Sequence, residues 1–185
     1  QKTDDEKKKV IILEKAIDLI SNEKRLLGNL EKEEIEYLNT FQLISIKPVV
    51  FVCNVDEDSA VNGNEFTKQI NEYAKKNNSE VLLVSAKIES EISQISDENE
   101  KKEFLESLGL IETGLKRVIR KGYEILNYIN FFTAGEKELR AWTIVKGSLA
   151  PTAAGTIHSD MEKGFIRAET ISYNDYIEFN GEAGS

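Results

Sequence analysis

The chain has 185 residues, 40% of them hydrophobic and 31% charged, and a formal net charge of −9. This composition is typical of a globular protein with a buried core, and the negative charge argues against nucleic-acid binding over the whole surface while leaving room for a local basic patch. The lone Cys53 excludes an internal disulfide and favours a reducing, cytoplasmic compartment, and no apolar run reaches the roughly 18 residues of a membrane span. Because Gln1 opens the chain on a charged run, we interpret it as a fragment of a longer protein.

Two helices are predicted over residues 5–30 and 31–43, where apolar residues recur at spacings of three and four. Charged residues fill the remaining faces. The apolar face of the first helix is expected to contain Val10, Leu13, Ile17 and Ile20. The pattern fits an antiparallel helical pair or short coiled coil that projects as an arm, and it fits a plain amphipathic core helix equally well.

A strand–helix–strand unit follows, with strands at 49–53 and 81–85 and a helix at 64–77. The continuous apolar runs are typical of parallel strands covered on both faces, and their order predicts a right-handed crossover. The expected buried face of the helix is Phe66, Ile70, Tyr73 and Ala74.

Three further helices and a small terminal module complete the expected organisation. One helix carries Ile88, Ile92 and Ile95, the next is capped by Ser96 and stopped by Gly109, and the third is capped by Thr113.

The terminal module is predicted from a change of pattern after Tyr128. Strands are expected at 129–133 and 139–144 around a turn at 134–137, then a helix at 152–161 and a third strand at 165–171. This order indicates a small α+β module of the β-grasp kind.

Polar motifs follow both strands of the strand–helix–strand unit, at the edge where parallel strands end together. Asn54 begins an Asn-x-x-Glu motif that ends at Glu57, and Ser85-Ala86 follows the second strand about thirty residues later. The amide of Asn54 can donate to N7 of a purine, and Val55 can supply an apolar seat. Either motif alone occurs by chance in polar turns, but the pair predicts the base-binding edge of a P-loop nucleotide fold.

The same residues predict which base is preferred. In guanine-specific proteins of this fold, a Lys packs on the base and an Asp accepts from the N1–H and 2-amino groups of guanine. Here Val55 and Glu57 stand at those positions, and the carboxylate of Glu57 lies one methylene further out. Adenine lacks both donors, so it loses nothing, and backbone carbonyls near Val55 can accept from its 6-amino group. We therefore expect ATP to bind in preference to GTP, with Lys87 packing over the base.

Neither Gly-x-x-x-x-Gly-Lys-Ser/Thr nor Asp-x-x-Gly occurs among the 185 residues. These motifs hold the phosphates and Mg²⁺ in P-loop enzymes. We therefore expect that this stretch alone does not hydrolyse nucleotide.

Longer blocks carry a family resemblance. Residues 112–120 (ETGLKRVIR), 132–144 (FTAGEKELRAWTI) and 154–168 (AGTIHSDMEKGFIRA), together with Asn54-Val55-Asp56-Glu57, resemble the YchF/Obg-like ATPase family. The resemblance covers residues 35–185 well and the first helix loosely.

The resemblance implies an α/β fold in three parts: the end of a helical, coiled-coil-like insertion (1–46), the C-terminal half of a P-loop nucleotide-binding domain (47–128), and most of a β-grasp-like TGS domain (129–185). It also implies a ribosome-associated hydrolase of ATP, with GTP the weaker substrate, that uses Mg²⁺ and contacts the large ribosomal subunit. The base motif would be carried by Asn54, Val55, Glu57, Ser85 and Ala86. The family's phosphate loop and Mg²⁺ ligands have no counterpart in this sequence. The alternative is a non-catalytic adaptor, formed by the helical arm and the TGS domain, that binds protein or RNA.

The segment Lys116–Lys146 is basic, because it contains seven basic residues and three acidic ones. The basic residues are Lys116, Arg117, Arg120, Lys121, Lys137, Arg140 and Lys146. It fits an RNA- or ribosome-facing patch or a solvated helix face, and the loop at 147–151 fits a protein docking surface.

Three residues with reactive or bulky side chains are assigned structural roles. We expect His158 to be a surface or capping residue rather than a catalytic one, Trp142 to lie in the core, and Cys53 to be a small buried hydrophobe.

Overall fold

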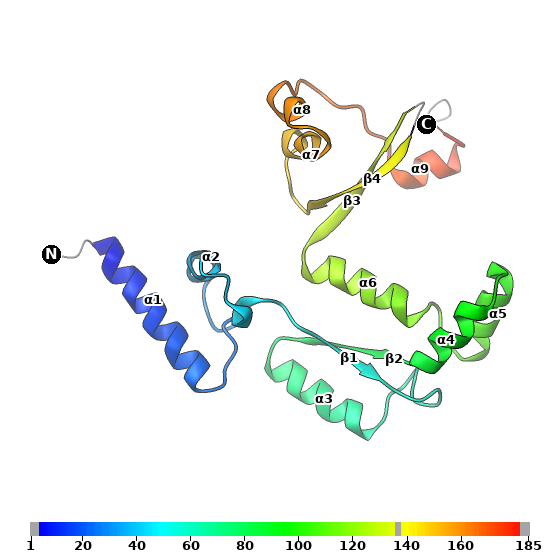
Figure 1. Cartoon of the computed structure of the whole chain (residues 1–185), viewed down its shortest axis with the longest axis horizontal. Coiled ribbons are helices and arrows are strands. Elements are labelled where there is room, and N and C mark those ends of the chain that lie inside the picture. Colours follow the sequence, from blue (N-terminus) through cyan, green and yellow to red (C-terminus); the bar gives the residue numbers. More distant parts are fainter. Residues whose placement is uncertain (1–3, 136–137, 182–185) are drawn as a thin grey trace. The chain divides into compact units, whose positions relative to one another are not determined.

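The computed structural model of the protein describes residues 4–135 and 138–181, which fold as two compact units, Gln1–Ile125 and Leu126–Ser185. In chain order, the elements of the first unit are α1 (Asp4–Ser21), α2 (Lys32–Asn39), the 3₁₀ helix η1 (Ile44–Ile46), β1 (Val50–Asn54), α3 (Glu65–Lys76), β2 (Glu80–Val84), α4 (Ala86–Gln94), α5 (Glu98–Ser107) and α6 (Gly114–Ile125) (Figure 1). Those of the second unit are β3 (Tyr128–Ala134), β4 (Leu139–Val145), α7 (Ala150–Ile157), α8 (Ser159–Lys163) and α9 (Tyr173–Glu178). None of the helices in these described ranges combines the length and apolar character needed to cross a membrane.

The helices α1 and α2 share a small apolar core with the segments that follow them. Its buried residues are Ala16, Leu26, Leu38 and Ile46. The side chains of Lys15 on α1 and Glu34 on α2 form an ion pair at 2.8 Å. The hydrogen bonds from Lys15 and from the backbone N–H of Glu31 lower the pKa of the Glu34 carboxyl.

The first helix is shorter than predicted, since it ends at Ser21 rather than at residue 30. Glu23 adopts a left-handed backbone conformation with φ 57°, and the N–H of Lys24 donates to the carbonyl of Leu19 at 2.9 Å. Glycine normally occupies such a closing position, so the sequence carries no signal for this end.

The buried face of α1 also differs from the prediction. Ile17 and Ile20 are exposed, whereas Ile12 and Leu19 pack against the buried residues. Because both sets recur at helical spacing, periodicity alone does not decide between them.

The strands β1 and β2 are parallel, with Phe51 opposite Val81 and Asn54 opposite Val84. Both strands therefore end at one edge, as predicted from the strand–helix–strand order. Arg25 joins the helical part to the opposite end of this sheet, where its guanidinium donates to Ser79 Oγ at 2.5 Å and to the carbonyl of Lys47 at 2.6 Å.

Helices lie on both sides of the two strands (Figure 1). On the α3 side, the ring of Tyr73 meets that of Phe51 edge-on at 5.8 Å. On the α6 side, Gly114 lies against the side chain of Val84. Coverage is incomplete, because Val52 on β1 is half exposed.

The start of α3 follows a strong local signal. The side chain of Asn64 accepts from the N–H of Thr67 at 3.1 Å, and the hydroxyl of Thr67 accepts from the N–H of Asn64 at 2.8 Å. Ala74 is buried as predicted, but Phe66 is 75% exposed. The predicted apolar face is therefore correct only in part.

The cap of α5 is displaced by one residue from the prediction. Asp97, rather than Ser96, accepts from the N–H groups of Asn99 and Glu100 at 2.9 and 3.0 Å. A carboxylate at this position also interacts favourably with the helix dipole.

The start of α6 is stabilised by the predicted cap and by a residue that the sequence did not single out. Thr113 Oγ1 accepts from the N–H of Lys116 at 3.2 Å. The carboxylate of Glu89 on α4 accepts from the N–H groups of Gly114 and Leu115 at 2.6 and 3.3 Å. Two helices distant in sequence are therefore fixed to each other beside the end of β2.

In the second unit, β3 and β4 form the predicted antiparallel hairpin, with Phe131 opposite Trp142. Glu136 and Lys137 of the predicted turn lie outside the described residues. Trp142 is half-buried rather than a core residue: its Nε1 donates to Thr133 Oγ1 at 3.0 Å, and the guanidinium of Arg140 stacks over its ring at 4.2 Å.

The predicted third strand is wrong. Residues 165–171 form neither helix nor strand, and no ladder joins them to β3 or β4. A strand needs a neighbour for its backbone hydrogen bonds, and Ile166 is fully exposed instead. The predicted helix at 152–161 is divided into α7 and α8 at His158.

Candidate functional site

The two strand-end motifs are joined by a direct hydrogen bond. Asn54 Oδ1, at the end of β1, accepts from the backbone N–H of Ala86 at 3.0 Å, although the residues are 32 positions apart. The N–H of Val55 also donates to the carbonyl of Val84 at 2.9 Å. The acceptor half of the Asn54 amide is thus used to position the second motif, which leaves its NH₂ group as the part with donors for a ligand.

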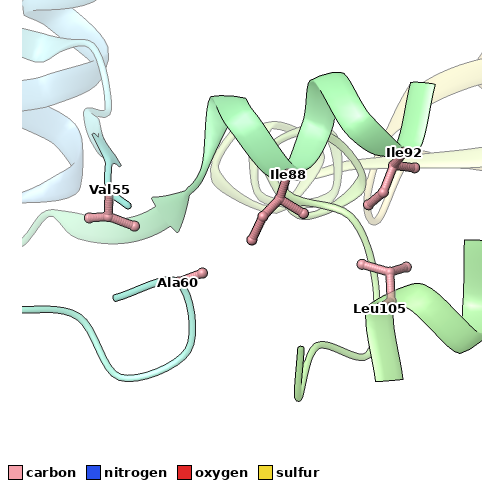
Figure 2. Packing of buried hydrophobic residues seen from close by; sticks show 5 residues of the cluster. All are labelled: Val55, Ala60, Ile88, Ile92 and Leu105. Atoms are coloured by element: carbon pink, nitrogen blue, oxygen red, sulfur yellow. The ribbon is translucent and has the colours of Figure 1, made fainter. Parts of the chain in front are cut away.

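Val55 has a different environment from the one expected. Its side chain is 9% exposed and belongs to a core cluster, which it shares with Ala60, Ile88, Ile92 and Leu105. Figure 2 shows Val55 at the strand end, with Ile92 of α4 and Leu105 of α5 pointing toward each other further along the cluster. The side chain of Val55 is therefore not placed as a seat for a base, and its backbone is what remains available to a ligand.

Ser85 lies between β2 and α4. It is 4% exposed, and its hydroxyl has no hydrogen-bond partner among the described residues. Although it occupies the N-cap position of α4, its side chain does not bond to the helix. A buried hydroxyl without a partner costs free energy unless something else satisfies it.

Glu57 and Lys87 form an ion pair across the two motifs. Lys87 Nζ lies 2.7 Å from Glu57 Oε1 and 4.0 Å from Glu91 Oε1. The hydrogen bond with Glu57 raises the pKa of Lys87. We expected Lys87 to pack over the base, but it holds the last residue of the first motif instead. The sequence did not predict this pair, because the partner of a long side chain depends on the three-dimensional positions of both residues. The one signal in the sequence is that residues of opposite charge follow two neighbouring strands.

The segment after the first motif folds back toward the core. Asp56 Oδ1 accepts from the N–H of Ser59 at 2.9 Å, and both Ser59 and Ala60 are buried. Gly63 then turns the chain toward α3 with φ +72°. The Asp56 turn therefore fixes the direction in which the chain leaves the strand end.

The Asp56 turn is expected to loosen in acid. Hydrogen bonds from the hydroxyl and backbone N–H of Ser59 lower the pKa of Asp56 below its ordinary 3.8. Because the pKa is lower in the folded state, the ionised carboxylate stabilises the turn fully at pH values above the ordinary pKa. This stabilisation is lost as the pH falls through the lowered pKa of the folded state. The backbone amide of Ser59, followed by NMR from about pH 5 to about pH 2, should lose protection from hydrogen exchange in that acidic range.

The matched control for the acid effect is Asp56→Asn, which keeps an acceptor oxygen but does not titrate. Its Ser59 amide should show no transition of this kind. An unchanged transition in Asp56→Asn would mean that another group controls the turn.

The comparisons with known proteins place the chain in a family. Proteins from Haemophilus influenzae and Escherichia coli O157:H7, both named Ribosome-binding ATPase YchF, are 46% identical to it over 175 and 185 residues, which are 94% and 98% of the chain. The chain belongs to the YchF family. It spans about half the length of these curated relatives, 48% and 50%.

Two further matches agree with membership of the YchF family. The family model YchF-GTPase_C, described as "Protein of unknown function (DUF933)", matches residues 128–185. The solved "Structure of the Schizosaccharomyces pombe YchF GTPase" is similar with a TM-score of 0.81 and 32% identity, over 96% of this chain and 48% of that one. The family resemblance predicted from the sequence motifs is thus confirmed.

The basic residues of α6 in this YchF family member are largely engaged within their own unit. Arg117 donates to the carbonyl of Leu83 at 2.6 Å, and Arg120 pairs with Glu112. Lys121 also pairs with acidic partners, namely Glu80 at 2.7 Å and Glu124. In the second unit Arg140 stacks on Trp142, while Lys137 lies outside the described residues.

His158 is the capping residue that the sequence predicted. Its Nδ1 accepts from the backbone N–H of Asp160 at 3.2 Å at the start of α8, and its side chain is largely exposed. It therefore ends α7 and begins α8 within this part of the YchF chain.

Proposed function

We propose that this chain carries the base-recognition edge of a ribosome-associated ATPase that binds ATP in preference to GTP. The observation that carries this proposal is the Asn54–Ala86 hydrogen bond, which joins the two strand-end motifs and leaves the NH₂ group of Asn54 as the part with donors for a ligand. In this arrangement the NH₂ group of Asn54 donates to the purine N7, the Ser85-Ala86 turn lies beside the base, and backbone carbonyls near Val55 accept from the adenine 6-amino group. The relatives' name, Ribosome-binding ATPase, supports the nucleotide and the ribosome as ligands.

The proposal also covers the domain, the cellular location and the partners that the family resemblance implies. It includes a TGS domain at residues 129–185, a cytoplasmic location that goes with ribosome binding, contact with the large subunit, and RNA contact through the Lys116–Lys146 segment. Exposed basic residues support this contact within each unit taken by itself, namely Lys116 in the first unit and Arg140 and Lys146 in the second. In the first unit Arg117 is less available for RNA, because its guanidinium donates to the carbonyl of Leu83.

Mg²⁺ is expected wherever the nucleotide phosphates are held. Among the described residues, no group of three or more His, Cys, Asp or Glu side chains is placed to bind a metal ion. We therefore assign none of these residues to Mg²⁺, and we propose that this stretch alone does not hydrolyse nucleotide.

The proposal is tested by calorimetric titration of the full-length protein with ATP and GTP, in the wild type and in Asn54→Asp. Aspartate keeps an acceptor for the Ala86 N–H but removes the amide donor and adds a negative charge. We expect tighter binding of ATP than of GTP in the wild type, and an ATP dissociation constant raised about tenfold in Asn54→Asp, which corresponds to about 1.4 kcal/mol.

Asn62→Asp is the matched control, since it adds the same charge at an exposed position of the neighbouring loop. It should leave the affinity for ATP within about twofold of the wild type, and both variants should melt at nearly the wild-type temperature. Preference for GTP in the wild type, or normal binding of ATP by Asn54→Asp, would refute the assignment.

A further inference from the structure

The ion pair between Glu57 and Lys87 joins the last residue of the Asn-x-x-Glu motif to the first turn of α4. Its atoms are 2.7 Å apart, and the Glu57 side chain is 35% exposed against 68% for Lys87. Glu91 is the second carboxylate near Lys87, at 4.0 Å, while Asp56 and Asp58 flank Glu57 in the chain. Lys87 is thus the cation that compensates Glu57 within a locally acidic strand end.

The two purine bases respond in opposite ways to a carboxylate at such a position. Guanine presents two donors on one edge, N1–H and the 2-amino group, which an unpaired carboxylate accepts in a charge-assisted bond. Adenine presents the N1 lone pair on the same edge, which an unpaired carboxylate repels. A carboxylate that already accepts from an ammonium group has less to offer guanine and less charge with which to repel adenine.

We propose that Lys87 is a specificity-determining positioning residue, which favours adenine over guanine by holding the Glu57 carboxylate in an ion pair. This inference rests on the proposed function, because it concerns the same base-recognition edge. Under this proposal the preference for adenine has two causes. One is the absence of an Asp at position 57, and the other is the ion pair between Lys87 and Glu57.

The test is to measure the dissociation constants for ATP and GTP in the full-length protein and in Lys87→Met. Methionine keeps most of the length and apolar stem of the side chain and removes the charge. We expect binding of ATP to weaken and binding of GTP to strengthen, so that the ratio of the two constants moves by about tenfold toward GTP. Since Lys87 is 68% exposed, the variant should fold like the wild type.

Three controls isolate the pair. Lys87→Arg keeps the cation and should keep the wild-type ratio. Glu57→Gln combined with Lys87→Met removes the freed charge and should return the ratio toward the wild-type value. Lys101→Met removes a similar pair at 2.6 Å with Glu98 on α5, and the ratio should not change.

Opposite signs for the two nucleotides distinguish positioning from a general structural effect. If Lys87→Met weakened ATP and GTP equally, the inference would be overturned and the proposed function would stand. If the wild type bound neither nucleotide, both would be overturned. If the double variant kept the shift of Lys87→Met, Glu57 would not be the group through which Lys87 acts, and the inference would fail.

Discussion

Ile88→Ala is expected to lower the free energy of unfolding of the first unit by about 2–5 kcal/mol. Ile88 is 1% exposed and belongs to the cluster that contains Val55, Ile92 and Leu105 (Figure 2). Truncation removes three methylene or methyl groups and leaves a cavity that the surrounding helices and strand fill incompletely. Urea unfolding followed by circular dichroism at a helical wavelength measures the change.

The one tryptophan provides an internal control for Ile88→Ala. Trp142 lies in the second unit, so its fluorescence reports on that unit rather than on the cluster around Ile88. Ile111→Ala makes the same chemical change at a position that is 98% exposed, and it should cost less than about 0.5 kcal/mol. Equal losses from Ile88→Ala and Ile111→Ala would show that burial in this cluster does not determine the stability of the unit.

Ile88 also connects stability to the candidate site. It lies two residues after Ala86, whose N–H is held by Asn54. A loosened α4 should therefore expose the amide of Ala86 to faster hydrogen exchange. Faster exchange of the Ala86 amide should accompany the loss of stability, because Ala86 and the core residue Ile88 both belong to α4.

The parts of the fold that the sequence predicted are those with local signals. Parallel strands end at one edge, so the proximity of Asn54 and Ala86 follows from the order of elements alone. Thr113 is a polar residue directly before helical periodicity, and it caps α6 as expected. Asn64, the first residue of the predicted helix at 64–77, is the N-cap of α3. His158 as a cap belongs to the same class.

The errors arise where a contact distant in sequence decides the outcome. The orientation of Val55 depends on the loop that returns Ala60 to the core. The partner of Lys87 depends on where the loop after β1 and the first turn of α4 place two flexible side chains. Apolar residues at 165–171 have strand composition but no neighbouring strand among the described residues. The early end of α1 uses a left-handed glutamate, Glu23, where glycine would have been the signal.

Gly114→Ala and Gly122→Ala are expected to change stability in opposite directions, although both lie in α6. A methyl group on Gly114 would lie 2.8 Å from Val84 Cγ1 and 3.0 Å from Glu89 Oε1. Valine is stiff about its first side-chain torsion, so the helix must move away from β2, at a cost of about 1–3 kcal/mol. At Gly122, outside the helix's own backbone, no described atom lies within 4 Å of the added methyl group. There alanine should stabilise the helix by about 0.5–1 kcal/mol.

The two alanine variants also separate packing from helix propensity in a single measurement. Urea unfolding followed by circular dichroism should place the midpoint of Gly114→Ala below that of the wild type and the midpoint of Gly122→Ala above it. In Gly114→Ala the amide of Leu115 should also exchange faster, because Glu89, which accepts from it, is displaced by the same methyl group. Midpoints that shifted in the same direction would contradict the close approach of α6 to β2 at Gly114. That approach fixes α6 to α4 through Glu89, and with it the helix whose first turn carries Ala86 and Lys87.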